Sequence, residues 1–234
     1  MAEGRLVVRR VIEDGRFRVR SVLVNAAASR DLAPVLAALA PSVPVFSGAP
    51  ATLTEIAGYD VHRGCLALVE RPPARAAGDV LAAARTLVIL EGVANPDNVG
   101  GVFRNAAAFG AGGVLLSPAC GDPLYRKAIR TSMGAVLRVP YAIADAWPDV
   151  LTDARAAGFT IVALTPREPS ESLDAFAGRP RASRVALVIG TEGEGLTAAV
   201  EAAADYRVRI PISPDVDSLN LSVAAAIALY ALRT

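Results

Sequence analysis

One stretch near the C-terminus, Ile210-Pro-Ile-Ser-Pro-Asp-Val-Asp-Ser-Leu-Asn-Leu-Ser-Val-Ala-Ala-Ala-Ile-Ala-Leu-Tyr-Ala-Leu232, joins the end of an apolar strand to a proline-stiffened loop and an alanine-rich helix. Ser218, Asn220 and Ser222 stand where the helix begins, and Ser and Asn commonly cap helices. Alone, the pattern predicts only a helix start. Two further strand-loop-helix junctions, at residues 87–110 and 185–200, indicate that all three form a site.

Outward from this stretch, strands alternate with helices through residues 85–234. Apolar runs predict strands at residues 85–91, 113–117, 137–141, 160–164, 185–190 and 206–212. Helices are predicted at residues 98–110, 122–133, 147–157, 196–204 and 221–232. The alternation is typical of a parallel sheet in a doubly wound α/β fold. Ligands of such sheets bind at the C-terminal ends of the strands.

A smaller α/β domain is predicted before this one. Helices are expected at residues 3–13, 29–39 and 52–57, and strands at residues 18–25, 43–46 and 65–70. Two prolines and several small residues at residues 71–78 are expected to stop regular structure. The predicted organisation is a domain at residues 1–72, a linker at residues 73–84 and a second domain at residues 85–234.

The composition indicates a globular protein of the cytoplasm. Apolar residues make up 53% of the chain, but no apolar run is long enough to span a membrane, and the N-terminal residues do not resemble a secretion leader. Cys65 and Cys120 are too few and too far apart for a metal cluster or a disulfide framework. The net charge of +1 provides no global basic field, so any contact with RNA must be local.

Arginines are concentrated near the N-terminus. Such a cationic set suits phosphate contacts, so the predicted RNA-binding residues are Arg5, Arg9, Arg16, Arg18 and Arg30. A solvated helix face beside an arginine-rich edge strand explains the same residues equally well. His62, the only histidine, is expected to have a structural role.

The glycine-rich loop at residues 190–196 does not fit a phosphate loop. It lacks the Lys-Ser/Thr of a P-loop and follows the fifth strand of the predicted sheet. Glu192 and Glu194 would repel phosphate, so the loop favours an uncharged ring or ribose. Asn98 and Arg104 can face one cleft with Glu192 if the strand ends converge.

In order and spacing, the three junctions resemble the motifs of SpoU (TrmH-type) RNA ribose 2′-O-methyltransferases of the SPOUT superfamily. The matching segments are Asn98-Val-Gly-Gly-Val-Phe-Arg104, Leu187-Val-Ile-Gly-Thr-Glu192-Gly-Glu-Gly-Leu and Ile210-Pro-Ile followed by Ser218-Leu-Asn220-Leu-Ser-Val-Ala. The resemblance covers about residues 85–234. Residues 3–70 resemble, more loosely, the L30e-like substrate-binding domain that precedes the catalytic domain in many members.

The resemblance implies a SPOUT fold with a deep trefoil knot, S-adenosylmethionine as cofactor, rRNA or tRNA as substrate, and a homodimer. By position it assigns a catalytic set of Asn98, Arg104, Glu192, Ser218 and Asn220. It assigns cofactor contacts, largely through backbone groups, to Leu164, Thr165, Gly190, Ile210, Ser218 and Leu219. The family's motif-one arginine is held to act as a base, but a guanidinium stays protonated, so an electrostatic role for Arg104 has equal weight.

Two other functions remain open at this point. The chain could be an RNA-binding module whose methyltransferase domain is inert, although the intact motif residues speak against it. A dinucleotide-dependent oxidoreductase is disfavoured by the lack of a glycine fingerprint after the first strand. The last helix is apolar almost all round, which predicts an isologous two-fold dimer with this helix and the one entering from Asn98 at its centre. An Ala228→Glu change is expected to split this dimer.

Overall fold

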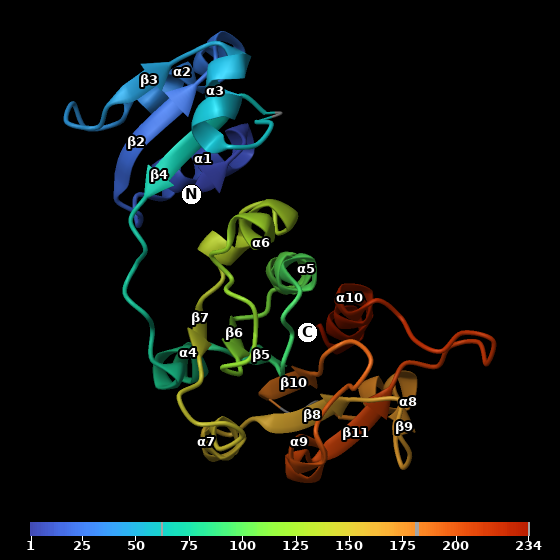
Figure 1. The fold of residues 1–234 in the computed structure, drawn as a ribbon. Helices are drawn as coiled ribbons and strands as arrows, with labels where there is room; N and C mark the ends of the chain where they lie inside the picture. The colour runs from blue at the N-terminus through green and yellow to red at the C-terminus, as the bar shows by residue number, and fades with distance from the viewer. Residues whose placement is uncertain (62, 181–182, 234) are drawn as a thin grey trace.

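The computed structural model describes residues 1–61, 63–180 and 183–233. It contains a smaller N-terminal unit and a larger C-terminal unit, drawn in blue at the top and in green to red below (Figure 1). His62 lies outside the described residues, so its predicted structural role is not tested.

The smaller unit is a four-stranded sheet covered on both faces. Its strands are β1 (Ala2–Glu3), β2 (Val19–Val24), β3 (Val45–Ser47) and β4 (Cys65–Val69), in the order β1-β4-β2-β3. Its helices are α1 (Arg5–Asp14), α2 (Ala26–Ala37) and α3 (Pro50–Ala57). Because side chains alternate along β2, Val22 and Val24 join one core with α1 and α2, while Leu23 joins another with α3. The predicted small α/β arrangement is present.

The larger unit is a seven-stranded sheet in which every neighbouring pair is parallel. The order is β7-β6-β5-β10-β8-β11-β9. The strands are β5 (Thr86–Leu90), β6 (Gly113–Leu116), β7 (Tyr141–Ile143), β8 (Thr160–Leu164), β9 (Glu171–Ser172), β10 (Val185–Ile189) and β11 (Tyr206–Arg209). The prediction of a parallel α/β sheet is confirmed.

Helices cover both faces of this sheet. They are α4 (Ala77–Ala83), α5 (Pro96–Ala108), α6 (Arg126–Thr131), α7 (Val150–Ala156), α8 (Leu173–Ala177), α9 (Ala198–Ala203) and α10 (Leu221–Leu232), with a 3-10 turn η1 at Ala135–Leu137. Val88 and Leu90 of β5 share a core with α5 and α10, whereas Leu87 and Ile89 share one with α4, α7 and α9. Burial on both sides explains why the strands are continuous apolar runs.

Several predicted elements need correction. The third strand was expected at residues 137–141, but the structure has η1 at Ala135–Leu137 and β7 at Tyr141–Ile143. Regular structure continues into the segment expected to be a linker, because α4 buries Val80 and Leu81 against the sheet. Helix α2 begins three residues early, since the Asn25 side chain accepts a hydrogen bond from Ala28 N at 2.8 Å and caps it. Strands β1 and β9 and helix α8 were not predicted.

Direct contacts join the two units. Arg126 at the start of α6 pairs with the buried Glu3 at 3.1 Å. Arg10 Nη1 donates to Met133 O at 2.6 Å, and Arg16 Nη2 donates to Leu137 O at 3.2 Å. One hydrophobic cluster also runs from α1 into the larger unit. These contacts hold the N-terminal unit against the helical face that carries α5 and α6.

Candidate active site

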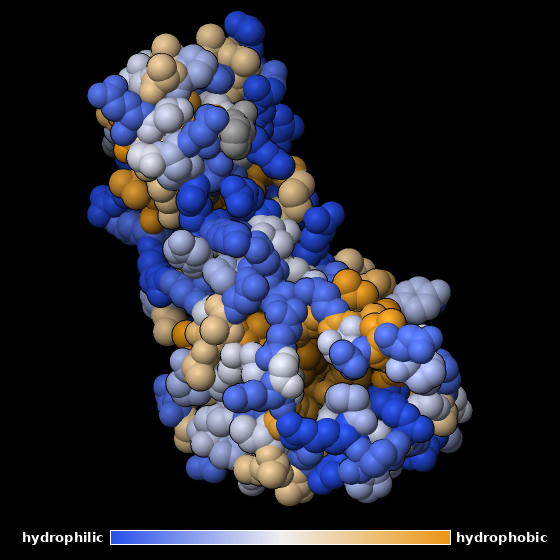
Figure 2. All heavy atoms as spheres, turned by 45° about the vertical axis from the view of Figure 1, so that its right-hand side comes forward, coloured by the Kyte–Doolittle hydropathy of each residue, from blue (hydrophilic) through white to orange (hydrophobic). Residues whose placement is uncertain are grey.

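A cavity of about 360 Å³ lies beyond the C-terminal ends of β8, β10 and β11. Three segments wall it: residues 164–166 after β8, residues 190–195 after β10, and the loop from residue 209 into α10. Figure 2 shows a hollow in the larger unit with hydrophobic residues in its depth. The position is the one at which parallel α/β sheets bind ligands.

All six residues predicted to contact a cofactor line this cavity: Leu164, Thr165, Gly190, Ile210, Ser218 and Leu219. Side chains such as Ile189 and Ile212 supply apolar surface, and Glu192 and Asp217 place acidic groups in the same walls. A mostly apolar cavity of this size, with a few polar groups, is typical of sites for small organic ligands, which run from roughly 300 to 1,000 Å³.

The β10 loop depends on its glycines. A Cβ on Gly190 would lie 2.3 Å from the carbonyl carbon of Gly195, so the two backbones pack with no room for a side chain. Gly193 and Gly195 have φ values of 86° and 72°, a region that glycine adopts without strain. The loop therefore presents backbone to the cavity.

Asn220 brings three of the predicted catalytic residues together. Its Nδ2 donates to Asn98 Oδ1 at 3.0 Å and to Glu192 Oε1 at 3.2 Å. Its Oδ1 accepts from Ser222 N at 3.0 Å and from Val223 N at 3.3 Å, which caps α10. One side chain thus joins the N-terminal parts of α5 and α10 to the β10 loop. Asn98, at 4% exposure, is held in a buried position.

In the described part of the chain, the other two predicted catalytic residues make no hydrogen bond to this cluster. Ser218 is exposed in the cavity wall. Arg104 is exposed on α5, does not line the cavity, and has no hydrogen-bond or ion-pair partner among residues 1–61, 63–180 and 183–233. On the same helix, Asn105 Nδ2 donates to Ser222 O at 2.6 Å and fixes α5 against α10. Among the described residues, Arg104 is therefore an unpaired cation on a helix that Asn105 fixes against α10.

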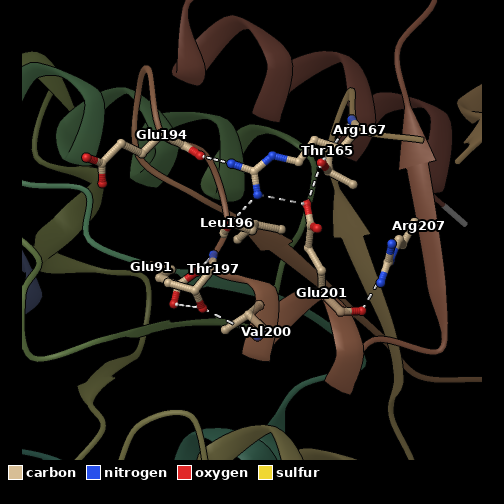
Figure 3. Close-up of polar contacts among 9 residues, drawn as sticks. All are labelled: Glu91, Thr165, Arg167, Glu194, Leu196, Thr197, Val200, Glu201 and Arg207. Atoms are coloured by element: carbon tan, nitrogen blue, oxygen red, sulfur yellow. Dashed lines mark hydrogen bonds and ion pairs between the residues drawn. The ribbon is translucent and has the colours of Figure 1, made fainter. Parts of the chain in front are cut away.

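A polar network that the sequence pattern does not predict lies behind the cavity (Figure 3). Glu91, at the end of β5, accepts from Thr197 N at 2.8 Å and from Trp147 Nε1 at 2.9 Å. Thr165 Oγ1 donates to the buried Glu201 at 2.7 Å, and Arg167 contacts the β10 loop. The one available signal was that Glu91 directly follows the buried strand β5, much as Glu192 closely follows β10.

Most of the arginines predicted to bind RNA have protein partners. Arg5 pairs with Asp31, and Arg9 Nη2 donates to Asp31 O at 3.1 Å. Arg16 donates from Nε and Nη2 to the two carboxylate oxygens of Asp14, and this side-chain hydrogen bonding is the main reason that the pKa of Asp14 is lowered. Arg18 lies 3.7 Å from Glu70. Arg30 is exposed and has no partner in the described part of the chain.

Within the described residues, no group of histidine, cysteine, aspartate or glutamate side chains could hold a metal ion. Across the same residues, no helix is both long enough and apolar enough to cross a bilayer. The site consists of an apolar cavity, an amide-carboxylate cluster and a nearby arginine. Such groups can bind a small organic ligand, orient a second reactant and stabilise developing negative charge.

Residues 85–230, which contain the whole cavity and the Asn220 cluster, match the family model described as the SpoU rRNA Methylase family. The chain belongs to the SpoU rRNA methylase family. The predicted resemblance is confirmed.

Similar proteins match nearly the full length of the chain. An uncharacterised tRNA/rRNA methyltransferase of Mycobacterium bovis is 39% identical over 230 residues, or 98% of this chain and 79% of the relative. The crystal structure of an AdoMet-bound rRNA methyltransferase from Sinorhizobium meliloti matches with a TM-score of 0.81 at 25% identity, covering 99% of this chain and 85% of that one. The crystal structure of an RNA 2′-O ribose methyltransferase matches with a TM-score of 0.77 at 28% identity, covering 99% and 86%.

Proposed function

We propose that this SpoU-family protein is an S-adenosylmethionine-dependent RNA methyltransferase that modifies ribose 2′-hydroxyls of rRNA or tRNA. The observation that carries the proposal is the Asn220 cluster, in which Asn98, Glu192 and Asn220 from three separate junctions meet at the cavity. An AdoMet-bound rRNA methyltransferase and an RNA 2′-O ribose methyltransferase with this fold support it.

The cavity suits S-adenosylmethionine. Leu164, Ile210 and Leu219 offer apolar surface for a purine, and the backbone of the β10 loop can approach a ribose closely because of its glycines. Glu192 and Asp217 lie in the wall and would favour a cationic ligand. When bound, this cofactor supplies an electrophilic methyl group carried on a sulfonium.

Arg104 is the residue proposed to act on the RNA. Its exposed guanidinium can hold a phosphate bidentately, which places the adjoining ribose hydroxyl for attack. Because a guanidinium stays protonated, it also stabilises negative charge that develops on the 2′-oxygen. Asn98, Glu192 and Asn220 keep the two helices and the β10 loop in register around the reacting groups.

A homodimer is part of the proposal, because Arg104 does not line the cavity of its own chain. Helix α10 exposes an apolar stripe of Val223, Ile227 and Tyr230, which are 48%, 38% and 55% exposed. The spacing of these residues places them on one face, and a second copy would cover it. Ala228, by contrast, is fully buried in its own chain. An Ala228→Glu change would therefore damage the protomer core, so the test suggested by the sequence is unsuitable.

Two architectural features also remain proposals. A trefoil knot is supported by β10 lying between β5 and β8, with the loops after β8, β10 and β11 meeting at one cavity. An L30e-like, RNA-binding role for the N-terminal unit is supported by its small α/β fold and by its contacts to the helical face beside Arg104. Arg30, which is exposed and has no partner in the described part of the chain, is a candidate phosphate contact.

An Arg104→Ala variant tests the proposed function. We expect methyl transfer to RNA to fall by about 10²-fold or more, because one charge contact to the transition state is removed, while calorimetry shows unchanged S-adenosylmethionine affinity. Arg85→Ala, an exposed arginine at the opposite end of the sheet, is the matched control. A wild-type protein that binds the cofactor without methylating RNA would support the inert-module alternative. Methylation outside the ribose 2′-position would refute the proposed specificity.

A further inference from the structure

The β10 loop at residues 190–196 forms one wall of the cavity and has little intrinsic rigidity. Three of its residues are Gly190, Gly193 and Gly195, and glycine loses more conformational entropy on ordering than any other residue. Inside the loop, Gly195 N donates to Thr191 O at 3.1 Å. A wall of this composition needs contacts from outside the loop if it is to keep one shape.

The C-terminal end of the loop is anchored by Glu91. Its carboxylate accepts from Thr197 N at 2.8 Å and from Thr197 Oγ1 at 2.9 Å, and it is only 6% exposed. These bonds fix the point at which the loop enters α9. They do not reach the segment between Gly193 and Leu196.

Arg167 holds that segment (Figure 3). Its Nη1 donates to Leu196 O at 2.7 Å, and its Nη2 donates to Glu194 O. The planar guanidinium presents its donors in a fixed fork, so it sets the separation of these two carbonyls. The two carbonyls bound by Arg167, those of Glu194 and Leu196, flank Gly195, which lines the cavity.

Glu201 ties the same guanidinium to the facing wall. Its carboxylate lies 3.6 Å from Arg167 Nη1 and accepts from Thr165 Oγ1 at 2.7 Å. The Glu201 side chain is only 8% exposed, so its charge requires these partners. Because Thr165 lines the cavity after β8, the chain of contacts from Thr165 to Glu194 spans two of its three walls.

We propose that Arg167 is a positioning residue for the cofactor, and that Arg167, Glu201 and Thr165 set the spacing of the β8 and β10 walls before a ligand enters. The identity of the ligand as S-adenosylmethionine rests on the proposed function. With the walls already ordered, binding does not have to order the glycine-rich loop, and affinity is higher for that reason. Arg167 does not line the cavity, so its effect passes through the loop backbone.

Calorimetry on the full chain tests the effect on affinity. An Arg167→Met variant should bind S-adenosylmethionine and S-adenosylhomocysteine roughly tenfold to a hundredfold more weakly, since charge-assisted hydrogen bonds are lost. At saturating cofactor, kcat should stay within about twofold, because no group touching the reactants has changed. Arg167→Lys, which can reach only one carbonyl, should fall between Arg167→Met and wild type. Unchanged affinity in Arg167→Met would overturn the proposal.

Arg155→Met is the matched control. Arg155 also grips a backbone carbonyl and a carboxylate, with Nη2 donating to Ala203 O at 2.5 Å and to Asp205 Oδ1 at 3.0 Å. Its partner Asp205 lies by Ile161, near the N-terminal end of β8 and away from the cavity. This variant should keep wild-type affinity. A loss equal to that of Arg167→Met would show a general loss of fold and overturn the positioning role.

Limited proteolysis with glutamyl endopeptidase tests the loop itself without any cofactor. Glu192 and Glu194 are exposed within the loop, so Arg167→Met should be cut there roughly tenfold faster than wild type, as expected for a loop that opens locally. Acceleration at every glutamate, or at none, would overturn the proposal. A wild-type protein with no affinity for S-adenosylmethionine would refute the proposed function. The cleavage rates would still test whether Arg167 orders the β10 loop, because that measurement needs no cofactor.

Discussion

Replacing Asn220 separates its helix-capping role from its role in the site. In Asn220→Ala, α10 loses its cap, which destabilises by about 1 kcal/mol. The amide oxygen of Asn98, in a residue only 4% exposed, also loses its donor at 3.0 Å, which adds about 1–3 kcal/mol. We therefore expect the free energy of unfolding to fall by about 2–4 kcal/mol in total. Asn220→Ser keeps a capping oxygen but is too short to reach Asn98, so it should lose only the second part.

Urea unfolding followed by circular dichroism measures these differences. The matched control is Asn95→Ala, which removes an exposed cap from α5, where Asn95 Oδ1 accepts from Asp97 N at 2.9 Å. It should lose about 1 kcal/mol. If Asn220→Ser is as stable as wild type, the bond to Asn98 contributes nothing to stability. If Asn220→Ala falls no further than Asn95→Ala, the reasoning from buried amides is wrong.

Three further experiments, two with substitutions and one with the unchanged chain, test other parts of the structure. Glu91→Gln should lower the free energy of unfolding by about 1–3 kcal/mol, because an amide NH₂ would face a donor of Trp147 or Thr197; an unchanged stability and emission spectrum of Trp147, the only tryptophan, would contradict this. Burial raises the pKa of the Cys65 thiol to about 11 from 9.0, so folding favours the neutral thiol; that contribution is fully present below pH 9 and is lost as the pH rises through 11. Iodoacetamide should therefore not label Cys65 at pH 8 unless urea is added, and rapid labelling of the native chain would disprove the burial. If the proposed dimer forms through the apolar stripe of α10, Ile227→Glu should leave the protomer folded and lower its sedimenting mass from dimer to monomer, whereas an unchanged dimer would exclude this face as the interface.

The sequence predicted the sheet of the larger unit well because its strands are covered on both faces. The runs that form β5 and β10 are continuous and apolar, and no competing pattern occurs there. Helix α4 shows where local pattern fails. Its residues are mostly alanine, glycine and aspartate, with a weak apolar face, and it is helical because Val80 and Leu81 pack into the core beneath β6. Tertiary contacts make this segment helical, although its composition predicted a linker.

The site residues also divide into those that the sequence pattern predicts and those that only tertiary contacts reveal. Asn98, Glu192 and Asn220 each follow a predicted strand at a polar junction, so convergence at one sheet edge could be predicted from topology. Arg167 and Glu201 have no such mark. Arg167 binds the backbone carbonyls of residues 194 and 196, which are 27 and 29 residues away in the sequence. Because every residue has a backbone carbonyl, the residue types at these positions do not reveal the contact. Contacts of side chains to distant backbone are invisible to motif analysis for that reason.

The arginines show why charge alone is a poor guide to RNA binding. A cluster of arginines in the sequence shows how many positive charges are present, but it does not show which groups of the folded chain pair with them. Arg5 and Arg18 pair with the carboxylates of Asp31 and Glu70, and Arg9 donates to the backbone carbonyl of Asp31. A phosphate would have to displace those partners. Arg104 and Arg30 are exposed with no partner in the described part of the chain, so a phosphate can bind them without breaking an ion pair. The salt dependence of RNA affinity should therefore weaken more in Arg30→Ala than in Arg18→Ala, because release of counterions follows the number of free cations that meet phosphate.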